Sequence, residues 1–122
     1  MIQQGVFVNF SAVKVILSHA SIILPYLAIR AAHLAADAQF SILPAGDVLN
    51  RKRTFYFDLM LSSNPSQLDL VLAFAKPDYV LYGSDFPYTL SKTIRTFVEA
   101  LDVYKDKSDE EKKYSITRGG AL

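Results

Sequence analysis

Three short runs of apolar, β-favouring residues recur along the chain, and a helical pattern follows each of them. These runs, rich in β-branched or aromatic side chains and therefore typical of buried strands, are residues 13–18, 54–58 and 79–82. The third run ends at Gly83, where the chain turns and presents Ser84 and Asp85. The dipeptide Phe86-Pro87 comes next, and proline disfavours a helical conformation at the residue before it.

Helical signals fill the segments between these strands. Pro25 suits the first turn of a helix that continues through residues 26–38, where alanines and other strong helix formers dominate. Asn64 and Pro65 can serve as the cap and the first-turn residue of a second helix. A third helix is predicted from Ser91, because apolar residues recur there at helical spacing. Its stripe comprises Ile94, Phe97, Val98 and Leu101.

The remaining segments carry weaker signals. Residues 5–10 read as the tail of a helix, and residues 41–53 read as a loop because they contain Pro44, glycine, aspartate and asparagine. The basic cluster Arg51-Lys52-Arg53 is expected on a solvated part of that loop. Ser108 and Glu111 have the spacing of a capping box for a last short helix.

Strand alternates with helix along the chain, which predicts a parallel α/β sheet. The strands begin about 25 to 40 residues apart, similar to the roughly 30 residues of one unit of a (β/α)8 barrel. The 122 residues suffice for a single domain, and no linker or repeat divides residues 1–122. We therefore predict one domain of about three βα units.

Composition narrows the function classes. The net charge is +1, from 13 basic and 12 acidic residues, so a nucleic-acid surface or an acidic-membrane surface is not expected. The chain has no cysteine, which rules out disulfides and thiolate ligands. No signal peptide is visible, and residues 22–29 are too short an apolar run to span a bilayer, so we expect a cytoplasmic protein. The mean hydropathy of +0.18 is high for a small domain, which indicates buried strands or a surface that meets a partner.

Residues that can do chemistry follow the predicted strands. If the strands are parallel, their carboxyl ends share one rim, which carries His19, Asp58 and Asp85. Histidine can act as a general acid or base, and both histidine and aspartate can ligate a metal. Spacing alone leaves Asp85 open to a plainer interpretation as a turn residue. His33 lies within a predicted helix, where an ordinary side chain is expected.

The rim segments carry a family resemblance. Residues 13–20 resemble strand six of amidohydrolase-related proteins, in the branch of aminocarboxymuconate-semialdehyde decarboxylase. Residues 54–58 resemble strand seven, the segment Gly83-Ser84-Asp85-Phe86-Pro87 resembles the end of strand eight, and residues 118–122 resemble the closing helix. Within that branch, residues 55–88 are most similar to fungal 6-methylsalicylate decarboxylases.

The resemblance implies the C-terminal portion of a metal-dependent (β/α)8 TIM barrel, usually a zinc enzyme. It implies that Asp85 is a catalytic residue and metal ligand, and that His19 is a catalytic residue that activates metal-bound water or polarises substrate. The implied activity is decarboxylation of a small aromatic carboxylic acid such as 6-methylsalicylate. A metal-dependent hydrolase of the same superfamily is the neighbouring alternative.

Two departures from the family pattern set up a rival hypothesis. Ser21-Ile22-Ile23 stands where the family usually has Gly-Gly-Thr, and Ile22 is expected to crowd the pocket. The family's His-x-His pair of strand one and its strand-five histidine have no counterpart in this sequence. We therefore expect this chain not to bind zinc tightly by itself. The rival is an inactive fragment that acts by self-association or by pairing with a full-length relative, through open sheet edges.

Overall fold

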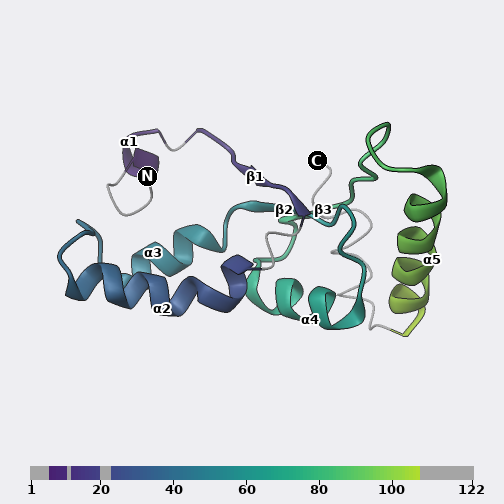
Figure 1. The fold of residues 1–122 in the computed structure, drawn as a ribbon. Helices are drawn as coiled ribbons and strands as arrows, with labels where there is room; N and C mark the ends of the chain where they lie inside the picture. The colour runs from purple at the N-terminus through teal and green to yellow at the C-terminus, as the bar shows by residue number, and fades with distance from the viewer. Residues whose placement is uncertain (1–5, 11, 20–22, 108–122) are drawn as a thin grey trace.

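The computed structural model describes residues 6–10, 12–19 and 23–107. Figure 1 shows helices and strands alternating along them. The elements, in chain order, are α1 (Val6–Asn9), β1 (Ile16–Leu17), α2 (Ile23–Asp37), α3 (Ala45–Lys52), β2 (Tyr56–Asp58), α4 (Pro65–Phe74), β3 (Val80–Leu81) and α5 (Ser91–Lys107). The predictions for residues 20–22 and 108–122, including the Ser108 capping box and the effect of Ile22, lie outside the described residues.

The three strands form one parallel sheet in the order β1-β2-β3, so the predicted α/β architecture is confirmed. Ile16 pairs with Tyr56 at the β1–β2 boundary, and Asp58 pairs with Leu81 at the β2–β3 boundary. Each apolar run that predicted a strand extends beyond the residues that pair, so the observed strands are shorter than the runs. β2 is the central strand and pairs with both β1 and β3.

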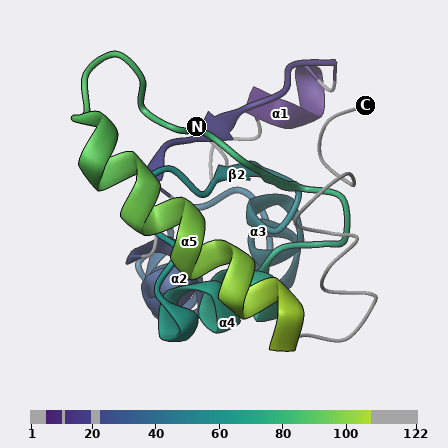
Figure 2. The same ribbon diagram turned by 90° about the vertical axis from the view of Figure 1, so that its right-hand side faces the viewer.

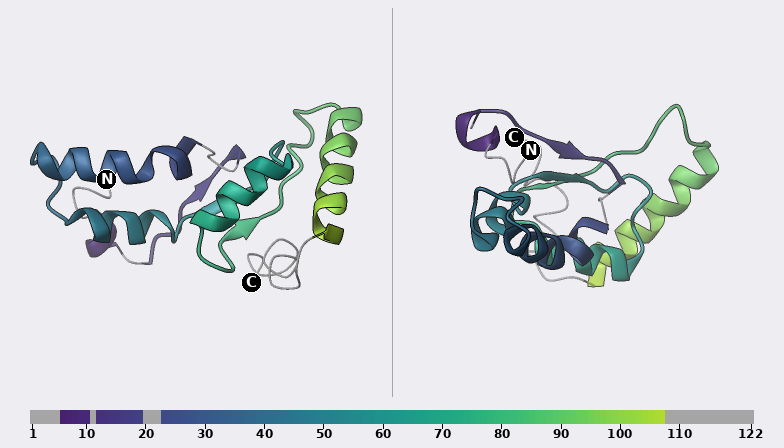
Figure 3. Two further views of the ribbon diagram at one scale, coloured as in Figure 1. Left: turned by 90° about the horizontal axis from the view of Figure 1, so that it is seen from below. Right: turned by 60° about the vertical axis from the view of Figure 1, so that its left-hand side comes forward.

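The two faces of the sheet differ. Figures 1 and 3 show α2, α3 and α4 on the same side of the strands. Phe57 and Val80 are register partners, and both are buried on that side in a core with residues of α4 such as Val71. Side chains alternate along a strand, so Tyr56 and Asp58 belong to the opposite, open face. The ring of Tyr56 meets that of Tyr79 there, with centroids 4.9 Å apart.

The prediction of a loop over residues 41–53 was wrong, because α3 occupies most of it. Val48 is fully buried against Ala32 of α2, so tertiary packing overrides the weak helix propensity of this segment. Lys52, predicted in a solvated cluster, is only 8% exposed, and burial lowers the pKa of its amine. The guanidinium of Arg53 lies 5.7 Å from the ring centre of Phe74.

The other helices agree closely with their sequence signals. The Asn64 side chain accepts a hydrogen bond from the Ser66 backbone N–H at 3.0 Å, and Pro65 opens α4, as predicted. α2 begins slightly before the predicted helix and packs its small alanines inward. α5 begins at Ser91, and Leu101 of its predicted stripe is buried.

In Figure 2, α5 crosses in front of α4, and Tyr104 of α5 belongs to the same buried cluster as Leu68 and Val71 of α4. The Tyr104 hydroxyl donates a hydrogen bond to Asp69 Oδ1 at 2.7 Å, which ties the end of α5 to α4. This bond joins residues far apart in the sequence and fixes the last described helix on the fold. None of the described helices combines the length and apolar character needed to cross a bilayer.

Candidate active-site rim

The carboxyl ends of the three strands meet at one edge of the sheet. β1 ends two residues before His19, β2 ends at Asp58, and β3 is followed by the turn that carries Asp85. Because the strands are parallel and adjacent, all three side chains belong to the same rim, as predicted. Ligands of α/β proteins bind at this end of the strands.

Each strand exit contains a residue in the left-handed backbone region. His19 follows β1 with φ 56°, Leu61 follows β2 with φ 53°, and Asp85 follows β3 with φ 62°. Gln39 and Asp78 share this conformation far from the rim, so it does not by itself mark a site. At the rim it bends the chain sharply just beyond each strand.

Asp85 is held in its turn by the residue four positions further on. The Thr89 hydroxyl donates a hydrogen bond to Asp85 Oδ2, and the Thr89 backbone N–H donates to the Asp85 carbonyl oxygen at 3.0 Å. Within the same turn, Ser84 Oγ accepts a hydrogen bond from the Phe86 backbone N–H at 3.3 Å. These bonds hold the half-buried carboxylate in one orientation.

Thr89 is a site residue that the sequence analysis missed. An aspartate followed four residues later by a threonine is the only signal it offers, and this spacing is common in any chain. The intervening Pro87 made a contact between Asp85 and Thr89 unexpected, because it marks a break in regular structure. The partnership depends on the shape of the turn.

His19 is exposed at the end of β1, while His33 is exposed in the middle of α2. An exposed imidazole at the rim can exchange protons with a bound molecule. His33 belongs to a helix that covers the sheet from one side, so the structure agrees with its prediction as an ordinary side chain. Between the two histidines, only His19 is at the strand ends.

The donor set for a metal is incomplete in the described part of the chain. An aspartate oxygen such as Asp85 Oδ1 is a suitable ligand for a divalent cation. A catalytic zinc usually takes three protein ligands. Over residues 6–10, 12–19 and 23–107, no group of three or more His, Cys, Asp or Glu side chains could hold a metal ion. Asp85 therefore fits as one ligand, and these residues do not complete the site.

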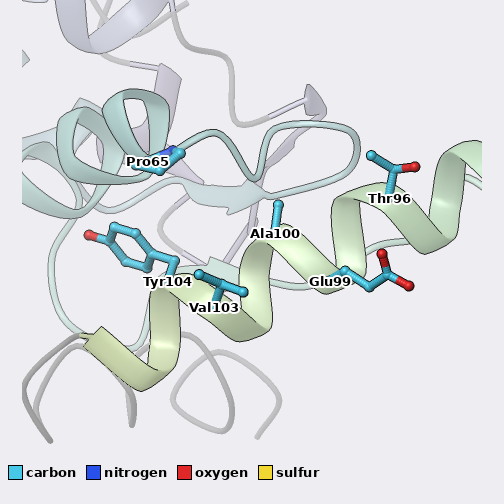
Figure 4. Close-up of a pocket in the computed structure, with 6 residues that line it drawn as sticks. All are labelled: Pro65, Thr96, Glu99, Ala100, Val103 and Tyr104. Atoms are coloured by element: carbon cyan, nitrogen blue, oxygen red, sulfur yellow. The ribbon is translucent and has the colours of Figure 1, made fainter.

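A wider groove lies away from the rim, between α4 and α5 (Figure 4). Its volume is about 650 Å³, and it is lined by Pro65, Thr96, Glu99, Ala100, Val103 and Tyr104. Among the described residues that line it, Glu99 is the only acidic one, and neither histidine is part of the lining. Apolar walls without an acid–base pair do not suit catalysis, so the rim remains the candidate site.

Parallel strands followed at one rim by an imidazole and a carboxylate form a candidate ligand-binding edge of an α/β protein. The amidohydrolase family model matches residues 1–115, and the chain belongs to this family. Members are generally metal-dependent. The family resemblance inferred from His19 and the Gly83-Ser84-Asp85 turn is confirmed at the level of the whole chain.

The relatives at sequence level are fungal decarboxylases. The decarboxylase yanB of Aspergillus niger is 40% identical over 125 residues, which cover 100% of this chain and 34% of that protein. The 6-methylsalicylic acid decarboxylase of Penicillium expansum is 37% identical over 123 residues, covering 100% of this chain and 37% of that protein. The chain thus spans about a third of the length of these curated relatives.

Solved structures agree on the fold. A crystal structure of an amidohydrolase II matches with a TM-score of 0.77 and 31% identity, covering 95% of this chain and 36% of that one. The 5-carboxyvanillate decarboxylase of Sphingomonas paucimobilis matches with a TM-score of 0.67 and 18% identity, covering 98% and 35% of the two chains. Both are TIM-barrel amidohydrolases, and the three parallel strands are consistent with the predicted C-terminal portion of such a barrel.

Proposed function

We propose that this chain contributes part of the active site of a metal-dependent decarboxylase that acts on a small aromatic carboxylic acid such as 6-methylsalicylate. The observation that carries the proposal is the rim, where Asp85 and His19 follow parallel strands in a chain 40% identical to a fungal decarboxylase over its whole length. The relatives' names favour decarboxylation over hydrolysis, and they give no support to an inactive fragment.

In this proposal Asp85 would be one ligand of the metal, while the Thr89 hydroxyl on Oδ2 keeps the carboxylate in one orientation. The metal, zinc in the proposal, supplies Lewis-acid stabilisation of negative charge on a substrate oxygen when it is bound. The imidazole of His19 acts in the proposal as the general acid or base that transfers a proton. Decarboxylation breaks the bond between the ring carbon and the carboxylate, carbon dioxide leaves, and the electron pair left on the ring carbon takes up a proton.

The remaining expectations belong to the same proposal. Residues 1–122 form part of a single amidohydrolase domain, and its ligand is the aromatic acid, with neither nucleic acid nor membrane as partner. Its cytoplasmic location and its self-association remain predictions from the sequence. The open edges of β1 and β3 within the described sheet are the feature that supports self-association.

The experiment that tests the function places residues 1–122 in the protein context that the relatives supply. We define the completed barrel as yanB with its matching third replaced by this chain. Purified completed barrel, loaded with zinc, is expected to release carbon dioxide from 6-methylsalicylate or a related aromatic acid. A completed barrel that folds, binds zinc and yet decarboxylates no aromatic acid of a small panel would show that the proposal is wrong.

The isolated chain of 122 residues is expected to bind zinc only weakly and to show no steady decarboxylation. Its described residues offer Asp85 and at most His19, where a catalytic zinc takes about three protein ligands. The rim is also open beyond β1 and β3, so charges aimed at a transition state act in water and lose most of their effect. Calorimetric titration with zinc and an assay of carbon dioxide release measure both properties. Submicromolar affinity with steady turnover would contradict this expectation.

A further inference from the structure

The carboxylate of Asp58 lies directly against the backbone of Gly83. A Cβ atom placed on Gly83 would come within 2.4 Å of Asp58 Oδ1 and 2.8 Å of Oδ2. Ordinary van der Waals contacts of a carbon atom are about 1 Å longer. The hydrogen that Gly83 carries in place of a side chain therefore points at the carboxylate, and a Cβ at this position would require the carboxylate or the turn to shift.

Hydrogen bonds hold Asp58 and its neighbour in this position. Its Oδ1 accepts a hydrogen bond from the Met60 backbone N–H at 3.0 Å. The intervening Leu59 N–H donates to the Leu81 carbonyl oxygen at 2.8 Å, which ties the same stretch of chain to β3. Asp58 is also a short, half-buried side chain with few rotamers. The hydrogen-bonded carboxylate thus borders the turn that follows β3.

The turn that follows β3 lies close to neighbouring elements. The cavity between them is only about 10 Å³, roughly the size of one water molecule. Leu59 and Leu61 of the loop after β2 line this cavity, as do Ile94 and Phe97 of α5. Residues 83–84 are thus separated from α5 by only a small space. The exit of β3 is confined between the Asp58 carboxylate and this packed layer.

We propose that Asp58 is a positioning residue: its carboxylate, seated against Gly83, sets the path of the turn that aims Asp85 at the rim. The proposal rests on the proposed function in so far as Asp85 is the site carboxylate. Asp85 follows Gly83 by two residues and has left-handed backbone angles, so a displacement at Gly83 passes directly to its carboxylate. In this role Asp58 acts on the site through its contact with Gly83.

The first test is structural and does not depend on activity. In ¹⁵N-labelled full chain, Asp58→Ala should shift the Met60 amide signal, because that amide donates to the carboxylate that this variant lacks. Gly83→Ala should displace the amide signals of both Met60 and Asp85. Gly46→Ala is the matched control, since a Cβ there meets nothing within 4 Å. Unchanged Met60 and Asp85 signals in Gly83→Ala would overturn the proposal.

A second pair of variants covers the case in which Gly83→Ala does not fold. Asp58→Ala removes the carboxylate and makes room for the new Cβ, so Asp58→Ala with Gly83→Ala should recover folded signals that Gly83→Ala alone lacks. Equal loss of folded signal in the single and the double variant would show that the contact does not set the turn. Both results are read from spectra, so they stand whether or not the chain serves a decarboxylase.

The activity arm uses the completed barrel and separates position from charge. Asp58→Asn keeps the shape and the acceptor for the Met60 N–H, so it should retain most of kcat. Asp58→Ala and Gly83→Ala should lower kcat about a hundredfold with little change in KM, as expected for a misplacement near 1 Å. Equal losses in Asp58→Asn and Asp58→Ala would assign a role to the charge and overturn positioning. If the completed barrel without substitutions is inactive while the amide signals shift as expected, the result would count against the proposed function and not against the positioning role of Asp58.

Discussion

Asp85→Asn in the completed barrel is expected to lower the rate of carbon dioxide release by at least about a hundredfold. Loss of an outer-shell partner of a metal ligand alone typically costs 10- to 100-fold, and loss of a ligand should cost more. Asparagine keeps the size of the side chain and can still accept from the Thr89 hydroxyl, so the turn should survive. The change removes the negative charge that the metal needs. Zinc content and turnover are measured on the same sample.

His19→Ala belongs to the same test and acts on the proton-transfer step. Removal of a general acid or base typically costs about a hundredfold to ten-thousandfold, and zinc content should fall less than it does in Asp85→Asn. The matched controls are Asp37→Asn and His33→Ala, both at exposed positions of α2 away from the rim. Full activity in the double variant of Asp85→Asn with His19→Ala would remove both residues from the site.

Phe57→Ala is expected to have the largest effect on stability. Phe57 is fully buried in the central strand, and its ring meets that of Phe74 edge to face with centroids 6.0 Å apart. Truncation of a buried phenylalanine typically costs about 3–5 kcal/mol, through lost burial and the cavity left behind. Domains of this size are stable by only about 5–15 kcal/mol, so much of the cooperative unfolding transition should disappear.

Urea unfolding of the full chain, followed by circular dichroism, measures this effect. Phe57→Leu keeps most of the volume and should cost less than about 1.5 kcal/mol. Phe40→Ala is the control for loss of an aromatic ring, because Phe40 is 71% exposed. Equal urea midpoints for Phe57→Ala and Phe40→Ala would show that Phe57 does not contribute to the core.

Local patterns predicted the strands and most helices because their signals act over a few residues. The apolar run before Asp58 could only be satisfied by burial, and Asn64-Pro65 carries its own helix start. The same patterns failed over residues 41–53, where glycine, aspartate and asparagine suggested a loop. α3 forms there because Val48 finds a buried place against Ala32 of another helix, and no local rule contains that contact.

The amino-acid sequence by itself determined which side chains could do chemistry and, through the order of strands and helices, that His19, Asp58 and Asp85 belong to one rim. Only the tertiary structure decided what each of them touches. The contact of the Asp58 carboxylate with Gly83 depends on strand register, and the hydrogen bond from Thr89 to Asp85 depends on the shape of a turn. Alternation of strand and helix is a repeating property that short windows reveal, whereas contacts between separate strand exits follow from the packing of the whole sheet.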